Sequence, residues 1–86
     1  MDFESLVAQA NSSVEKQNIP EAINLFEQAL KVNSTSYDVL SKLGTLNLQI
    51  GNLQASKEYF KKSLLINPNS FKAYSNLGTI YFRLNE

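Results

Sequence analysis

The feature that most constrains this sequence is a repeat of 34 residues that runs from residue 3 to the last of its 86 residues without a gap. Residues 41–46 align with residues 75–80 one period later, and both segments hold Ser, Leu, Gly and Thr at the same places. The first period is weaker but stays in register, since Phe26 aligns with Phe60. A chain with such a period folds as a stack of similar units, each packed on its neighbours, rather than around one central core.

Within one period the apolar residues fall at helical spacing, as Leu40, Leu43 and Leu46 do. This spacing indicates amphipathic helices, two in each period. Gly51, which can adopt a positive φ, and Pro68, which cannot continue a helix, are expected to mark helix ends. The connections are then so short that neighbouring helices must be antiparallel. The sequence therefore predicts an all-α protein with five helices, over residues 3–16, 20–33, 37–50, 54–67 and 71–85.

A few residues predict how these helices begin and pack. Ser36 and Ser70 precede two of the helices and are expected to be their N-caps. Gly44 and Gly78 lie inside helices, where Gly costs about 1 kcal/mol relative to Ala. That cost is expected where another helix approaches closely, and Phe60 is expected to fill the space between such helices.

The middle period, residues 37–70, resembles the tetratricopeptide repeat, a helix pair with small and aromatic residues at fixed positions. The matching residues are Leu40, Leu43, Gly44, Ser56, Phe60, Ser63 and Pro68. Asn47 departs from the pattern, because Tyr is usual at its position. Residues 3–36 form a more degenerate first repeat, and residues 71–86 a partial third. The resemblance implies one domain over residues 1–86, a right-handed superhelical stack of antiparallel helix pairs.

Composition excludes several classes of function. The chain has no His and no Cys, and its 8 basic residues balance its 8 acidic ones. It therefore lacks the commonest metal ligands and acid–base groups, and we expect no enzyme activity, no cofactor and no metal. The zero net charge and the absence of a long apolar run also argue against binding of nucleic acid or membrane. We expect a cytoplasmic protein, because no signal peptide is evident.

The resemblance implies a scaffold for protein–protein interaction, in which the first helix of each repeat lines a concave groove for an extended peptide segment of a partner. Its positions carry over to nine expected groove residues: Asn11, Lys42, Thr45, Leu48, Lys72, Asn76, Thr79, Phe82 and Arg83. The alternative is a solvated helix face with no ligand.

One subfamily of these domains grips the C-terminal carboxylates of chaperones with basic and Asn side chains. Asn11 and Lys72 match its pattern, whereas Val7, Lys42 and Asn76 stand where Lys, Asn and Arg are expected. The resemblance therefore does not extend to this carboxylate clamp.

The last expected helix has no second helix of its own repeat in this sequence. We expect its apolar residues Tyr74, Leu77 and Tyr81 to form a self-association face, which would make the protein a homo-oligomer. The alternative is that the sequence is a segment of a longer repeat protein.

Charge is also unevenly distributed: residues 1–43 carry three Lys against six acidic residues, and residues 44–86 carry five basic residues against two acidic ones. This polarity would suit head-to-tail stacking.

Overall fold

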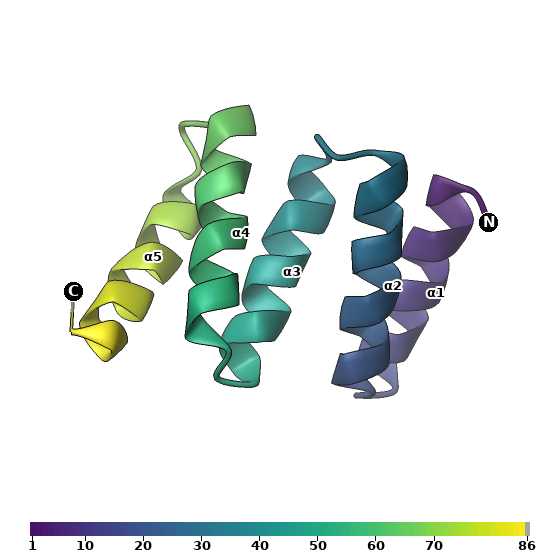
Figure 1. Ribbon diagram of the computed structural model, residues 1–86, viewed down its shortest axis with the longest axis horizontal. Helices are drawn as coiled ribbons and strands as arrows, with labels where there is room; N and C mark the ends of the chain where they lie inside the picture. The colour runs from purple at the N-terminus through teal and green to yellow at the C-terminus, as the bar shows by residue number, and fades with distance from the viewer. Residues whose placement is uncertain (86) are drawn as a thin grey trace.

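The computed structural model describes residues 1–85 as five α-helices, with no strand in that range (Figure 1). The helices are α1 (Phe3–Glu15), α2 (Ile19–Val32), α3 (Tyr37–Gln49), α4 (Leu53–Ile66) and α5 (Phe71–Leu84). Each begins and ends within one residue of the range expected from the sequence. The all-α prediction is therefore confirmed.

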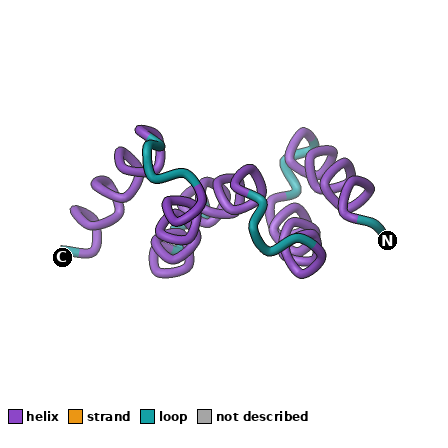
Figure 2. Tube along the Cα trace, turned by 90° about the horizontal axis from the view of Figure 1, so that it is seen from above, coloured by secondary structure: helices purple, strands orange, loops and turns teal. Residues whose placement is uncertain are grey.

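The helices form two layers in an elongated stack that measures 38 × 25 × 17 Å. Figure 2 shows α1, α3 and α5 in one layer and α2 and α4 in the other. Each helix packs mainly on the helices that precede and follow it in the chain. The layer of α1, α3 and α5 therefore presents a row of first helices, one from each repeat.

Serine side chains cap the helices that open the second and third repeats. The Ser36 hydroxyl accepts a hydrogen bond from the Val39 N–H at 3.2 Å, and the Ser70 hydroxyl accepts one from the Ala73 N–H at 3.2 Å. Both predicted N-caps are thus confirmed. Each cap satisfies one of the backbone donors that a helix start leaves without an intrahelical partner.

The residues that follow α1, α3 and α5 share one backbone conformation. Gln17, Gly51 and Asn85 occupy the same position in successive repeats, and all three have a left-handed backbone, with φ of 60°, 80° and 61°. At the second of these ends the Asn52 N–H reaches back to the Asn47 carbonyl at 2.8 Å, which closes the helix. Gly51 pays no steric cost in this conformation, whereas a residue with a Cβ does.

The closest approach between helices lies at Gly44 in α3. A Cβ added to Gly44 would come within 2.8 Å of the Phe60 ring of α4, and the Ser56 hydroxyl donates to the Gly44 carbonyl at 2.6 Å. Phe60 is 1% exposed. The expectation that Gly44 admits a neighbouring helix is therefore confirmed, and Phe26, the equivalent of Phe60 in the first repeat, is also fully buried.

The last helix differs from expectation at three positions. Tyr81 was expected on an uncovered face, but it is partly buried against the core between α4 and α5. Leu77 was expected on an uncovered face, but it is 6% exposed and packs with Phe60 and Ile80 in the core between α4 and α5. Gly78 was expected to admit a close helix, yet nothing lies within 4 Å of a Cβ placed there among the described residues. α5 packs on α4 as α3 packs on α2, so Leu77 lies in the core and Gly78 lies on the side of α5 that no described helix covers.

The two helical glycines make a matched pair of stability predictions. We expect Gly44→Ala to lower the free energy of unfolding by about 1–3 kcal/mol, because the new methyl group overlaps a ring that is packed on all sides. We expect Gly78→Ala to raise it by up to about 1 kcal/mol, because Ala favours the helix and the site is open. Urea unfolding followed by circular dichroism measures both, and equal effects at the two sites would contradict the packing described.

The left-handed position after α1 yields a second prediction. Gln17→Gly should raise the free energy of unfolding by about 0.5–1 kcal/mol, since it removes the Cβ from an unfavourable backbone conformation. Gly51→Ala is the reciprocal control, because it introduces a Cβ at the equivalent position, where space is open but φ is positive. Thermal and urea unfolding should show opposite shifts for the two variants.

Candidate functional site

A hollow of about 310 Å³ opens between α1, α3 and the start of α5. Its floor is apolar and its rim is polar or charged. The apolar residues are Val14, Phe26 and Leu46, and the others are Asn11, Tyr37, Asp38, Ser41, Lys42, Thr45, Gln49 and Lys72. Most come from α3, where positions three and four apart share one side of the helix.

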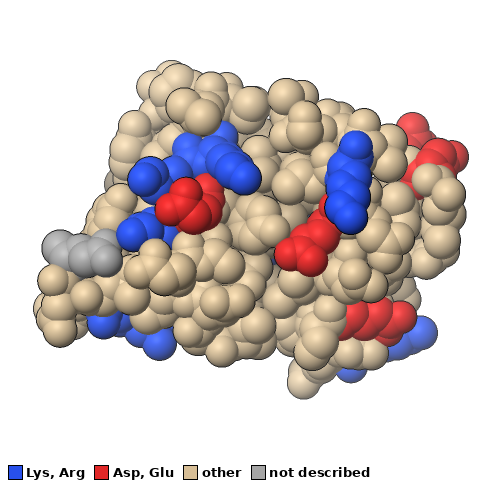
Figure 3. Space-filling model, viewed as in Figure 1, with Lys and Arg blue, Asp and Glu red and all other residues tan. Residues whose placement is uncertain are grey.

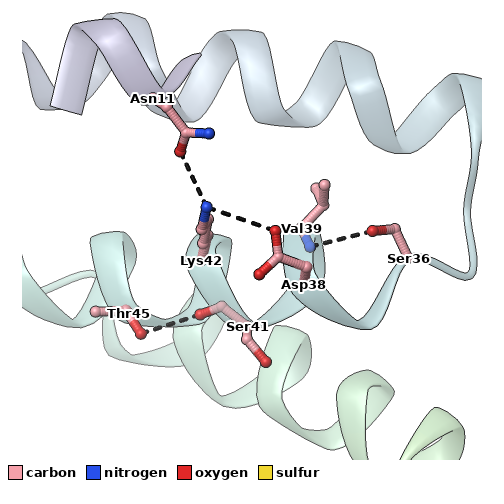
Figure 4. Close-up of polar contacts among 7 residues, drawn as sticks. All are labelled: Asn11, Ser36, Asp38, Val39, Ser41, Lys42 and Thr45. Carbon is pink, nitrogen blue, oxygen red and sulfur yellow. Dashed lines mark hydrogen bonds and ion pairs between the residues drawn. The ribbon is translucent and has the colours of Figure 1, made fainter. Parts of the chain in front are cut away.

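Lys42 lies at the centre of the hollow and links α1 to α3. Its Nζ donates to Asn11 Oδ1 at 3.0 Å and lies 3.5 Å from Asp38 Oδ2 (Figure 4). The same nitrogen lies 5.7 Å from the centre of the Phe26 ring, within range of a cation–π contact. These contacts fix the ammonium group in position, and Asp38 balances its charge. Because an ammonium has three donors, one remains for a ligand.

The Thr45 hydroxyl has no free proton to donate to a ligand. Its Oγ1 donates to the Ser41 carbonyl at 3.0 Å, one turn earlier in α3 (Figure 4). Thr79 does the same in α5, with the Ser75 carbonyl at 3.3 Å. Both hydroxyls therefore donate their proton to a backbone carbonyl of their own helix, and toward a ligand they can act only as hydrogen-bond acceptors.

Tyr37 is a rim residue that the sequence prediction missed. Its hydroxyl lies 2.6 Å from Ser70 Oγ, which also caps α5, so it ties the start of α3 to the start of α5. The hydrogen bond with Ser70 is the main reason that the pKa of Tyr37 falls below its usual value near 10. The available signal was the aromatic residue that opens every repeat: Phe3, Tyr37 and Phe71.

On the side of α2 and α4, another tyrosine links successive repeats. The Tyr59 hydroxyl donates to Glu27 Oε2 at 3.0 Å, which joins α4 to α2. Burial, together with this hydrogen bond to a carboxylate, raises the pKa of Tyr59 to about 12. This phenol is therefore held in its neutral form.

The charges of the molecule separate along the stack. In Figure 3 the basic side chains gather toward the α4–α5 end and the acidic ones toward the α1–α2 end. The hollow follows this trend, because Lys42 is balanced by Asp38 whereas Lys72 adds a further positive charge on the α5 side. The α5 side of the hollow is therefore the better place for an acidic group.

The structure brings four of the nine predicted groove residues into the hollow: Asn11, Lys42, Thr45 and Lys72. The other five lie outside it. Leu48 packs partly buried beside the α4–α5 core, Asn76 is half-buried, and three are exposed on α5, namely Thr79, Phe82 and Arg83. The predicted groove thus divides into a formed hollow at α1 and α3 and an open helix surface at α5.

Comparison with known proteins gives a consistent result. The family profile of the tetratricopeptide repeat matches residues 13–79. A comparison of the sequence with curated proteins finds no match. None of the helices within the described residues is long and apolar enough to cross a bilayer.

Solved structures share the fold. The crystal structure of MamA superposes with a TM-score of 0.92 at 21% identity, over 98% of this chain and 49% of that one. The Sgt2 domain from Aspergillus fumigatus gives 0.84 at 23% identity, over 96% of this chain and 55% of that one. The first tetratricopeptide domain of RPAP3, bound to an HSP90 peptide, superposes with a TM-score of 0.61 at 15% identity, over 99% of this chain and 94% of that one. This chain therefore spans about half the length of the MamA and Sgt2 chains.

The two linking tyrosines give a prediction about ionisation. In a spectrophotometric titration we expect Tyr37 to ionise below pH 10 and Tyr59 near pH 12. Tyr37→Phe should remove the early part of the curve and Tyr59→Phe the late part. Because the folded pKa of Tyr59 is raised, its contribution to stability is complete below about pH 10 and is lost as the pH rises toward 12. Loss of an identical component in both variants would contradict these assignments.

Proposed function

This chain belongs to the tetratricopeptide repeat family, as the match over residues 13–79 shows, and from that premise we propose that it is a protein-interaction scaffold which binds an extended peptide segment of a partner. The segment would lie in the hollow between α1, α3 and α5. The observation that carries the proposal is the hollow itself, an apolar floor surrounded by positioned polar groups and built around Lys42.

The size of the hollow limits what it takes. Its volume of about 310 Å³ is at the lower end of the range for small-molecule pockets. It suits one apolar side chain of a peptide, placed over Val14 and Leu46, with the peptide backbone crossing the polar rim. An isolated small molecule would find few directed partners on so open a surface.

The rim offers both kinds of hydrogen-bonding partner that a peptide backbone needs. Asn11 accepts from Lys42 and keeps its own amide donors, so it suits a peptide carbonyl. Thr45 has its proton engaged and suits a peptide N–H. An extended backbone presents both groups at regular intervals, which is why an extended segment fits this rim.

The partner segment should carry a carboxylate at the α5 side of the hollow. Lys42 already has Asp38 beside it, whereas no ion pair is described for Lys72 within residues 1–85. A carboxylate near Lys72 would therefore meet a charge that the fold has not neutralised. The RPAP3 domain, which shares this fold, is bound to the acidic HSP90 peptide SRMEEVD. That supports an acidic segment here, but not a chaperone tail, because Val7, Lys42 and Asn76 depart from the clamp pattern.

The proposal predicts a binding partner that depends on Lys72. We expect a peptide array to yield segments with an apolar residue followed by acidic ones, with binding measured by fluorescence anisotropy. Lys72→Glu should weaken such a peptide about tenfold, or about 1.4 kcal/mol, because it reverses the charge that meets the carboxylate. Lys62→Glu, the same change at an exposed position of α4, is the matched control and should leave binding unaltered.

A second variant tests the hollow rather than its charge. Ser41→Leu places a larger apolar side chain over the floor and should displace the peptide while the helix remains intact. If Lys72→Glu and Ser41→Leu both bind the peptide as the original chain does, the segment binds elsewhere and the proposed site is wrong.

A further inference from the structure

The outer side of α5 carries an apolar strip that no other part of the described chain covers. We call this strip, made of Phe71, Tyr74, Gly78 and Phe82, the end face. Phe71 is 86% exposed, Phe82 is 83% exposed and Tyr74 is 55% exposed. Their spacing of three and four residues puts them on one side of the helix. Contiguous exposed aromatic surface of this kind marks an interaction site.

The preceding repeat shows what such a face does when it is covered. At the positions equivalent to Tyr74 and Gly78, α3 has Leu40, which is 2% exposed, and Gly44, which lies against α4. There the Phe60 ring sits against the glycine. The end face therefore has the construction of a helix-docking surface, and Gly78 leaves a gap in its middle.

The opposite end of the stack has a different character. The outward side chains of α1 include Ser5, Gln9 and Ser12, at the positions where α5 has Ala73, Leu77 and Ile80 packed on α4. All three are exposed in α1. A polar outer surface is typical of a terminal cap in repeat proteins. Head-to-tail stacking would set the aromatic end face against this polar surface, which buries little apolar area on the α1 side.

We propose that the end face docks on the end face of a second copy of this chain, through a two-fold axis that passes beside Gly78. Gly78 lies at the middle of α5, and Tyr74 and Phe82 are each four residues from it. In an antiparallel pair, Tyr74 then meets Phe82 of the partner subunit, and the same contact occurs twice. A face that matches itself in this way is the requirement for an isologous dimer.

Two further observations suit this arrangement. Gly78 would let the two helices approach closely, as Gly44 does within the chain. The Tyr74 hydroxyl donates to the Pro68 carbonyl at 3.0 Å, so its ring is held in place before any partner arrives. Antiparallel helices also oppose their dipoles favourably.

The area of the end face sets the strength of the pair. Three aromatic side chains from each copy, at about 150–250 Å² each, bury roughly 1,000 Å² in total, which is near the lower limit for a specific interface. Lys72 and Arg83 flank the face on the same helix, so the two copies also bring positive charges near one another. We therefore expect a dimer that forms only at high protein concentration and strengthens when salt is added.

Sedimentation equilibrium over a wide concentration range tests the proposal with the intact chain. We expect a reversible monomer–dimer equilibrium that Tyr74→Lys and Phe82→Glu each weaken at least tenfold. Leu65→Glu removes an equally exposed apolar side chain from α4 and should change nothing. An equimolar mixture of Tyr74→Lys and Phe82→Glu should recover association, because the antiparallel register pairs the introduced lysine with the introduced glutamate.

A cysteine variant tests the axis directly. The chain has no cysteine, so Gly78→Cys introduces a single thiol, which the two-fold axis places beside its copy. We expect it to form a disulfide-linked dimer much faster than Leu65→Cys under the same oxidant. A strictly monomeric chain at the highest concentration, association that survives both charged variants, no recovery in the mixture, or equal cross-linking rates would each overturn the proposal. Circular dichroism confirms that the variants remain folded.

Discussion

The contact on which this structure depends is the close approach of two antiparallel helices, shown by the Phe60 ring against Gly44. A side chain at Gly44 would collide with the ring. At the same point the Ser56 hydroxyl donates a hydrogen bond to the Gly44 carbonyl. Helices held this close can tolerate only small residues at their crossing. This contact fixes how α3 and α4 are aligned, and it therefore determines which side of α3 faces the hollow. The hollow is thus a consequence of core packing.

The parts of the structure that depend on nearby residues could be predicted from the sequence. Helix ends follow from Ser36, Gly51 and Pro68, whose effects reach only a few residues along the chain. The positions expected to line a groove came from the family resemblance; Lys42 and Thr45 do line the hollow, and their role in binding stays a prediction. Tyr37 was missed because its partner Ser70 is 33 residues away. The aromatic residue that opens every repeat marks the position in the sequence but does not indicate this contact.

The remaining differences concern which side of α5 is covered and how far α5 lies from α3. Spacing showed that α5 has an apolar stripe, but not which part of the stripe α4 covers. Leu77 went to the core and Tyr74 to the surface, because Leu77 points at Phe60. α5 packs on α4, so most of its expected groove residues do not join the hollow. Thr79 and Arg83 are therefore exposed on a helix surface rather than in a cavity.

No packing contact within the described residues explains why position 78 is a glycine. A glycine inside a helix costs about 1 kcal/mol relative to Ala, and at Gly44 the approach of α4 explains that cost. Gly78 carries the same cost with no neighbour among the described residues. Its flanking aromatic residues add exposed apolar surface, which also disfavours the isolated state. Both unfavourable features are removed together when a helix covers the end face, and the hollow at α1 and α3 remains open when it does.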